Sequence, residues 1–245
     1  MKYKYVVLDF GNVLVTPTTG DWHMTPKFLE LIDINKLNMD KYNEMFDKYK
    51  HLLSEKLLTM EEEYDMFIRF YDGILSNVDY PGYTKKIALG IAYDRTYNNS
   101  KYTLCDNVIN ELTILKKKYK LLMITDNWPC VIPYMKDNGL YDFFDKIYIS
   151  SVYHELKRDG LFFEHSISDY NIKPGEALYI DDNESLLDVA TTKGFDCILM
   201  DRTKLINNSK YKIINDLSNI WIRWHFFIIK VCYNELVKLL TKIIY

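Results

Sequence analysis

The chain has 245 residues, 48% of them hydrophobic, and a formal net charge of -3 at pH 7. Its 31 Lys and Arg residues and 34 Asp and Glu residues are spread along the sequence, which argues against a nucleic-acid-binding surface. The four cysteines are far apart and lack metal-binding or redox spacing, which argues against a disulfide framework and favours a reducing compartment. Because the N-terminus does not resemble a signal peptide, we expect a cytoplasmic protein.

The N-terminal segment 5–15, YVVLDFGNVLV, predicts a buried strand that ends in a carboxylate. The apolar run before Asp9 is typical of a buried parallel strand, and the Gly-Asn pair after Phe10 predicts a turn. In an open α/β sheet, ligands bind at the carboxyl ends of the strands. Asp9 therefore either caps a turn or faces a binding crevice, and this segment alone does not decide between the two.

Residues 17–97 show helical periodicity and no strand pattern. We expect a short helix capped by Thr25 and a longer one over about 39–53, with apolar residues on one face. Thr59 is expected to cap a third helix that has three glutamates in its first turn. A fourth helical stretch is expected over about 83–97. The segment therefore predicts a helical domain inserted after the first strand.

From residue 98 onward, helical and strand patterns alternate. The expected elements are helices from Asp106, over 131–138, from Leu161 and over 185–192, and strands at 121–124, 146–150, 177–180 and 197–200. This alternation predicts an α/β fold with a doubly wound parallel sheet, formed by residues 1–16 and 98–205.

Residues 206–245 are predicted to form a C-terminal helical extension. Polar side chains fall four residues apart on its otherwise apolar helix, at Lys230, Asn234, Lys238 and Lys242. The segment contains no run of 18 apolar residues, so a membrane span is not expected. For residues 220–245, packing on the same domain, contact with a dimer partner and binding to a membrane surface all remain open.

Polar residues at or beyond the ends of three later strands are expected to lie at the same edge of the sheet as Asp9. These residues are Thr125, Asp126 and Asn127 after the first of them, Lys157 beyond the second, and Asp181 and Asp182 after the third. Because clustered carboxylates repel one another, they imply a hard cation, and oxygen ligands suit Mg²⁺. Thr125, the backbone amides that follow it and Lys157 would hold phosphate oxygens. Asp9 could then attack phosphorus in line and form an aspartyl-phosphate.

These segments resemble the four motifs of the haloacid dehalogenase-like (HAD) hydrolase superfamily. DFGNVL at Asp9 is similar to the first motif and MITDN at Thr125 to the second. Lys157 is similar to the third motif, and YIDDN at Asp181 to the fourth. The resemblance covers about residues 3–205 and implies a Rossmann-like core, with the inserted helices as the superfamily's cap.

The resemblance implies a Mg²⁺-dependent phosphatase that acts on small phosphorylated metabolites. The implied roles are catalysis by Asp9 and Lys157, phosphate binding by Thr125, Asp126, Asn127 and Lys157, and metal binding by Asp9, Asp181, Asp182 and the Gly11 backbone carbonyl. A dehalogenase is the first alternative, although the acidic pair of the fourth motif argues against it. The second alternative is a catalytically weak binding or regulatory protein.

Gly11 indicates which subgroup of the superfamily the chain resembles. Phosphatases of the superfamily usually carry there a second Asp, which acts as general acid and base. The Gly form looks like the subgroup of glucose-1-phosphate phosphatase and the phosphatase domain of epoxide hydrolases. Losing a general acid costs ~10²- to 10⁴-fold in rate. Asp21 and His23, in the loop that leaves the site, either replace this acid or serve as a hinge of the cap. We expect a substrate with a good leaving group, such as a sugar 1-phosphate.

Two further positions depart from the superfamily pattern, and the role of one aromatic residue stays open between two alternatives. Asp126 stands where Asn is common, and Arg158 stands where Pro commonly follows the lysine. Both departures bear on the phosphate-binding geometry. Trp128 either lines the substrate pocket or packs beneath the cap.

Overall fold

Six parallel strands form the central sheet of the computed structural model, which describes residues 2–220. The strand order across the sheet is β5 (Lys146–Ile149), β4 (Lys120–Thr125), β1 (Tyr5–Leu8), β6 (Ala177–Asp181), β7 (Asp196–Met200) and β8 (Lys212–Ile214). The N-terminal strand β1 lies inside the sheet, where Leu8 is in register with Met123 of β4 and Ile180 of β6. The prediction of a parallel α/β sheet is confirmed.

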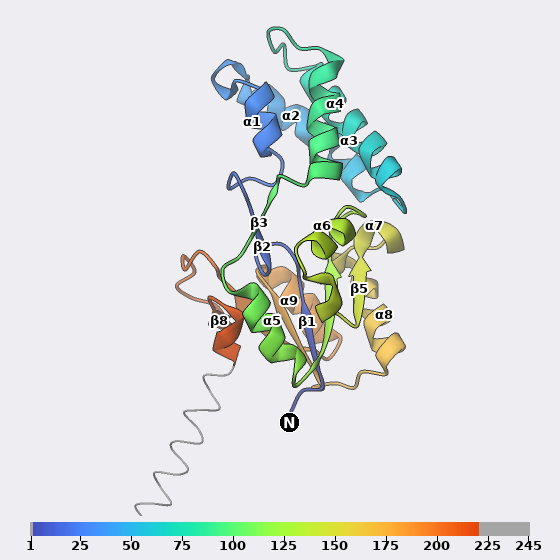
Figure 1. Ribbon diagram of the computed structural model, residues 1–245, viewed down its shortest axis with the longest axis vertical. Coiled ribbons are helices and arrows are strands. Elements are labelled where there is room, and N and C mark those ends of the chain that lie inside the picture. The colour runs from blue at the N-terminus through green and yellow to red at the C-terminus, as the bar shows by residue number, and fades with distance from the viewer. Residues whose placement is uncertain (1, 221–245) are drawn as a thin grey trace, which may run out of the picture.

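Helices cover both faces of the sheet (Figure 1). They are α5 (Val108–Lys116) and α6 (Val131–Asp137) on one face, and α8 (Leu161–Tyr170) and α9 (Glu184–Thr192) on the other. Val6 and Leu8 pack with α5 and α6, whereas Val7 packs with α8 and α9. Because side chains alternate along a strand, the apolar run of β1 fills both cores. The short helix α7 (Ser150–Tyr153) follows β5 directly.

The inserted segment forms a second domain with its own core. Its helices are α1 (Pro26–Leu31), α2 (Met39–Tyr49), α3 (Met60–Leu75) and α4 (Lys85–Tyr93), and short 3-10 turns lie at Ile34–Lys36 and Lys50–Ser54. Phe28, Phe67 and Phe70 are fully buried among these helices. Thr59 caps α3 as predicted, in a reciprocal arrangement with Glu62. In Figure 1 this domain lies above the carboxyl ends of the strands.

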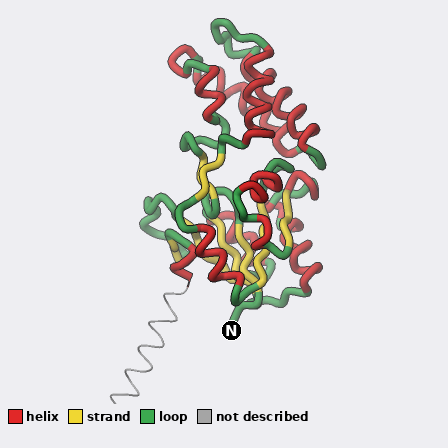
Figure 2. The backbone as a smooth tube through the Cα atoms, viewed as in Figure 1, coloured by secondary structure: helices red, strands yellow, loops and turns green. Residues whose placement is uncertain are grey.

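Two short antiparallel strands, β2 (Val15–Pro17) and β3 (Tyr102–Leu104), connect the two domains. Figure 2 shows them as a separate yellow ribbon between the sheet and the helices. We therefore define the helical domain as residues 18–101. Three-residue strands carry too few positions for an alternating pattern, which is why the sequence did not predict them. Between α4 and β3 the chain makes a π-helical turn at Asp94–Asn98.

Two local predictions differ from the structure. Asn107, in a left-handed conformation, precedes α5 instead of a capping Asp106. The strand β8 lies within the segment expected to be helical, because KII at 212–214 extends the sheet alongside β7. A 3-10 turn at Leu217–Ile220 follows it. The predicted helix and polar stripe of 221–245 lie outside the described residues.

None of the helices within residues 2–220 is long and apolar enough to cross a membrane.

Candidate active site

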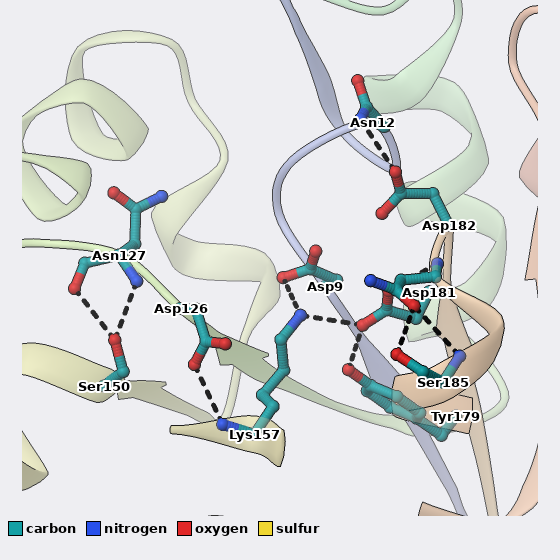
Figure 3. Close-up of polar contacts among 11 residues, drawn as sticks. Asp9, Asn12, Asp126, Asn127, Ser150, Lys157, Tyr179, Asp181, Asp182 and Ser185 are labelled. Carbon is teal, nitrogen blue, oxygen red and sulfur yellow. Dashed lines mark hydrogen bonds and ion pairs between the residues drawn. The ribbon is translucent and has the colours of Figure 1, made fainter. Parts of the chain in front are cut away.

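Adjacent strand ends bring three of the predicted carboxylates together (Figure 3). Asp9 directly follows β1, and its backbone N–H donates to the Ile180 carbonyl of β6 at 3.0 Å. Asp181 is the last residue of β6, and Asp182 follows it. One carboxylate oxygen from each of these three aspartates lies within 4.8 Å of the other two. The parallel register therefore gathers groups that are more than 170 positions apart in the sequence.

Lys157 places a buried ammonium group among these carboxylates. It begins a 3-10 turn at Lys157–Asp159, and only 3% of it is exposed. Its Nζ donates to Asp181 Oδ2 at 2.8 Å and lies 3.0 Å from Asp9 Oδ1. Burial by itself lowers the pKa of Lys157, but the charges of Asp9, Asp181 and Asp126 outweigh burial and raise that pKa. Lys157 is therefore a permanent cation.

One lysine does not balance the negative charge of the site. Burial raises the pKa of Asp9, Lys157 lowers it, and Asp181 and Asp182 raise it again, which places it at about 7. Asp9 Oδ1 is close to the ammonium group but accepts no hydrogen bond from any described residue. Three clustered carboxylates around one ammonium group fit a hard divalent cation, for which oxygen is the preferred ligand.

A network around the acidic pair fixes its orientation. Asp181 accepts hydrogen bonds from the Tyr179 hydroxyl and, at 2.9 Å, from the Asn183 backbone N–H. Asp182 Oδ2 accepts a hydrogen bond from Asn12 Nδ2 at 2.8 Å. Asn12 was interpreted from the sequence only as part of a turn, and it does occupy the left-handed region at φ 51. The turn after β1 thus also positions a carboxylate from β6.

The Thr125–Asn127 loop presents fewer free donors than the sequence predicted. Thr125 ends β4 and lines the site cavity, and its hydroxyl forms no hydrogen bond to any described residue. The Asn127 backbone N–H, however, donates to Ser150 Oγ at 3.0 Å. The Trp128 backbone N–H donates to Asn127 Oδ1 at 3.0 Å. The Thr125 hydroxyl is therefore freer to meet a phosphate than these two amides.

The two departures from the superfamily pattern lie in different surroundings. Asp126 Oδ1 accepts a hydrogen bond from the Lys157 backbone N–H at 3.0 Å, which fixes the turn that carries the lysine. Burial raises the pKa of Asp126, and Lys157 opposes that rise. The Arg158 side chain is 73% exposed beside Asp159 and does not line the cavity. Only Asp126 is part of the site.

Gly11 leaves room that an indole ring occupies. A Cβ atom at Gly11 would lie 3.4 Å from Cζ2 of Trp22, the nearest heavy atom to it. This distance is ordinary van der Waals contact, but a longer side chain would compete with the indole for the same space. Position 11 is therefore flanked by an aromatic ring from the connecting loop.

A cavity of about 310 Å³ lies between the sheet and the helical domain. Its lining includes all the predicted site residues, namely Asp9, Gly11, Thr125, Asp126, Asn127, Lys157, Asp181 and Asp182. Its volume is at the small end of the range for ligand pockets, so it suits a small molecule. Trp128 lines this cavity and also packs under the helical domain, with its ring centroid 5.1 Å from that of Phe67.

Of the two suggested substitute acids, only His23 reaches the cavity. Asp21 Oδ1 caps a turn, accepting hydrogen bonds from the backbone N–H groups of His23 and Met24 at 2.6 and 2.9 Å. His23 lines the cavity, and its buried Nδ1 has no hydrogen-bond partner within residues 2–220. Burial, assisted by Arg95, lowers the pKa of His23 to about 4. His23 is therefore neutral at pH 7, and its remaining ring N–H is a poor general acid for a leaving group.

The structure adds site residues that the sequence did not indicate. Arg95, Lys101 and Tyr102 come from the segment that returns from α4 to the sheet, and all three line the cavity. They belong to no recognisable motif. The only available signal was the dense polar stretch DRTYNNSKY at 94–102, between a helix and a strand.

A family model described as haloacid dehalogenase-like hydrolase matches residues 30–200, more than half of the chain. The chain belongs to the haloacid dehalogenase-like hydrolase family. The match begins after Asp9, whose place in the site rests on the register of β1 with its two neighbours. A search of curated proteins finds no significant match to this sequence.

Solved structures of haloacid dehalogenase-like proteins share the fold. The magnesium-bound HAD-hydrolase YfnB of Bacillus subtilis is 15% identical with a TM-score of 0.64, covering 90% of this chain and 98% of its own. The HAD family enzyme bt-2542 of Bacteroides thetaiotaomicron, in complex with magnesium and inorganic phosphate, is 20% identical with a TM-score of 0.60, covering 84% and 98%. A 2-haloacid dehalogenase of Pseudomonas syringae is 17% identical with a TM-score of 0.57, covering 91% and 99%.

Proposed function

We propose that this hydrolase is a Mg²⁺-dependent phosphatase of small phosphorylated metabolites. The observation that carries the proposal is the cluster of Asp9, Asp181 and Asp182, with oxygens within 4.8 Å of one another beside the buried Lys157. The magnesium and phosphate bound to bt-2542, which has the same fold, support it. A dehalogenase needs no metal, so the acidic cluster favours phosphate chemistry over halide release.

The donor set fits Mg²⁺. Asp9, Asp181, Asp182 and the backbone carbonyl of Gly11 would hold it, with water completing the shell. When bound, Mg²⁺ supplies positive charge that reduces the repulsion between a carboxylate nucleophile and a phosphoryl group. It would also lower the pKa of Asp9 from about 7 and keep the nucleophile ionised at neutral pH.

The chain's own residues divide the reaction between them. An ionised Asp9 oxygen attacks phosphorus and forms the aspartyl-phosphate while the ester P–O bond breaks and its electron pair leaves with the alcohol oxygen. Lys157 holds Asp9 in place and, with the Thr125 hydroxyl, binds phosphoryl oxygens. Water then attacks the aspartyl-phosphate, which releases inorganic phosphate and restores Asp9.

An aryl phosphate assay on the wild-type protein tests this proposal. Turnover should require added Mg²⁺ after treatment with a chelator, and Asp9→Asn should lower kcat by at least about 10³-fold, as loss of a nucleophile typically does. Asp137→Asn is the matched control, because Asp137 is exposed at the end of α6 and forms no described side-chain contact.

Two outcomes would contradict the proposal. Metal-independent release of halide from a 2-haloacid would favour a dehalogenase. Turnover no faster than that of Asp9→Asn, with or without Mg²⁺, would favour a binding or regulatory protein. Thermal unfolding with Mg²⁺ alone provides a readout that does not depend on activity, because a ligand that binds only the folded state raises Tm.

A further inference from the structure

Arg95 is a buried cation in the part of the cavity wall that the helical domain contributes. It lies in the π-helical turn after α4, and only 1% of it is exposed. Its Nη1 donates to the Trp22 carbonyl at 2.5 Å and to the Tyr71 hydroxyl at 3.3 Å. Its guanidinium carbon lies 4.4 Å from the ring centroid of Phe67 and 5.4 Å from that of Trp128. These contacts fix the plane of the guanidinium group.

The remaining donors of Arg95 have no partner among residues 2–220. Nε is buried without a hydrogen bond, and Nη2 donates to no described atom. Because Nε and Nη2 share one edge of the guanidinium plane, their N–H groups form a fork that matches two oxygens of a carboxylate or phosphate. Two free donors on one edge, in a residue that lines a cavity, describe half of a binding site.

No carboxylate within the described residues forms an ion pair with Arg95. Glu63 interacts electrostatically with Arg95, but among the described residues one of its oxygens accepts the Cys130 backbone N–H at 2.8 Å and the other has no hydrogen-bond partner. Burial raises the pKa of Glu63, and the charges of Lys101 and Arg95 oppose that rise. An unpaired buried charge is costly, so this arrangement is expected to have an anionic partner.

A buried lysine lies next to Arg95, and burial lowers its pKa. Lys101 is 1% exposed and lines the same cavity. Its Nζ donates to the Arg95 carbonyl at 2.5 Å and to Cys130 Sγ at 3.2 Å, and it forms no described ion pair. His23, with its unpartnered Nδ1, lines the cavity as well. Among the described residues, the part of the cavity wall from the helical domain is thus rich in donors, and no carboxylate of that domain lines the cavity.

We propose that the Nε–Nη2 edge of Arg95 binds a second anionic group of the substrate, while the phosphoryl group lies at Asp9 and Lys157. The proposal rests on the phosphatase function proposed above. A cavity of about 310 Å³ suits one small molecule that carries both anionic groups. The substrate class is a phosphate ester that carries a carboxylate or a second phosphate.

Matched pairs of substrates test this proposal. Glycerol 3-phosphate and 3-phosphoglycerate differ only by a hydroxymethyl group in place of a carboxylate, as do glucose 1-phosphate and glucuronic acid 1-phosphate. Glucose 1,6-bisphosphate supplies a phosphate in the same place. Within each pair, the wild-type kcat/KM should be about 10- to 100-fold higher for the substrate that carries the extra carboxylate or phosphate. This range is expected for charge-assisted hydrogen bonds. The substrate with the higher kcat/KM, whether it carries the carboxylate or the second phosphate, shows which anionic group Arg95 binds.

Variants at Arg95 should remove this preference. In Arg95→Met the ratio within each pair should fall to near one, mainly through a higher KM for the more charged member. Arg95→Lys should recover only part of the ratio, because an ammonium group lacks the fork. Arg69→Met is the matched control, because Arg69 is on the outside of α3, half exposed and paired with Glu55, and it should keep the wild-type ratio.

Failure of this proposal and failure of the phosphatase function have different signatures. Wild-type turnover without preference within the pairs, or an equal loss for both members in Arg95→Met, would show that Arg95 is only structural. Calorimetric binding of the same pairs to Asp9→Asn covers the case without turnover. In Asp9→Asn, tighter binding of the more charged substrate supports the subsite if adding Arg95→Met removes it. Equal binding of both substrates to Asp9→Asn overturns the subsite.

Discussion

Asp9 and Gly11 are two residues apart on one turn, and they decide different halves of the proposed reaction. In that proposal Asp9 would supply the nucleophile, and its pKa of about 7 places it where a nearby cation would ionise it. Gly11 supplies no side chain to protonate the leaving oxygen. His23, the nearest alternative, is neutral at pH 7 because its pKa is about 4. The alcohol of the substrate must therefore leave largely without help.

This absence of an acid predicts a dependence on the leaving group. Glucose 1-phosphate should be hydrolysed faster than glucose 6-phosphate, because an anomeric oxygen is the better leaving group, by up to the ~10²-fold that a general acid is worth. Single-turnover rates at saturating substrate measure the chemical step for both sugars. The two esters carry the same charge, so the Arg95 subsite does not affect the comparison, and equal or reversed rates would contradict the prediction.

At this scale the sequence predicted the residues that follow strands directly. Asp9, Thr125 and Asp181 could be recognised because each ends an apolar run that reads as a buried strand. Arg95 could not, because its role comes from being buried against Trp128, a residue brought near it only by the folded chain. Their assignment as site residues stays a prediction until the variants are measured.

The packing of α2 on α3 depends on one glycine. An ideal Cβ on Gly73 of α3 would lie 2.5 Å from Cε1 of Tyr49, the last residue of α2. Such a distance is shorter than any real contact, so the ring must move if position 73 gains a side chain. The close approach of the two helices therefore explains a glycine that would otherwise weaken a helix interior.

Gly73→Ala should consequently destabilise the helical domain by about 1–3 kcal/mol, the usual cost of overpacking. In the background of Tyr49→Ala, the same substitution should be neutral or stabilise by about 0.5–1 kcal/mol, because alanine favours a helix more than glycine does. Denaturant unfolding of the wild type, the two single variants and the double variant gives the free energies of this double-mutant cycle. An equal cost of Gly73→Ala in both backgrounds would show that the Tyr49 contact is not the cause.

Helix ends were predictable where the capping chemistry was complete. Thr59 with Glu62 three residues later is such a case, and both halves of the reciprocal cap form. Asp106 suggested a cap by residue type alone, but the chain begins α5 one residue later, through a left-handed Asn107. A single capping residue competes with its neighbours, so the position of a helix start depends on the turn before it.

The stability of the whole molecule should depend on pH through His23. Its pKa is about 4 in the folded protein, against an ordinary value of 6.5, so the unfolded chain binds a proton that the folded chain does not. As pH falls below 6.5 the folded state loses stability, and the loss is complete only below pH 4. The contribution should reach roughly 2 kcal/mol at pH 5.

His23→Phe isolates this effect, because it keeps an aromatic ring against Phe46 and removes the titrating group. The variant's stability relative to wild type should increase by roughly 2 kcal/mol between pH 7.5 and 5, measured by denaturant unfolding. The remaining titratable groups are common to both proteins and cancel in the difference, apart from Asp21, whose pKa His23 helps to lower. A difference that stays constant with pH would refute the buried, neutral state of His23.

At the scale of the molecule, the order of elements was predictable and the way the domains meet was not. Alternating helices and strands give a parallel sheet, because few other topologies accommodate them. Periodicity in residues 17–97 shows which faces are buried, but not which loop of the helical domain closes the site. That depends on the turn at Asp94–Asn98 and on two strands of three residues each.

The two strands of that ribbon also make the helical domain topologically a single long hairpin loop. Pro17 and Tyr102 are register partners, so the chain leaves the α/β domain and returns to it at neighbouring positions. The closure entropy of a loop grows only with the logarithm of its length, so the sheet is almost insensitive to how many residues lie between these ends. Insertions, deletions or exchanges within residues 18–101 can therefore change the shape and charge of the cavity wall that the helical domain contributes. The strand register that gathers the carboxylates stays the same.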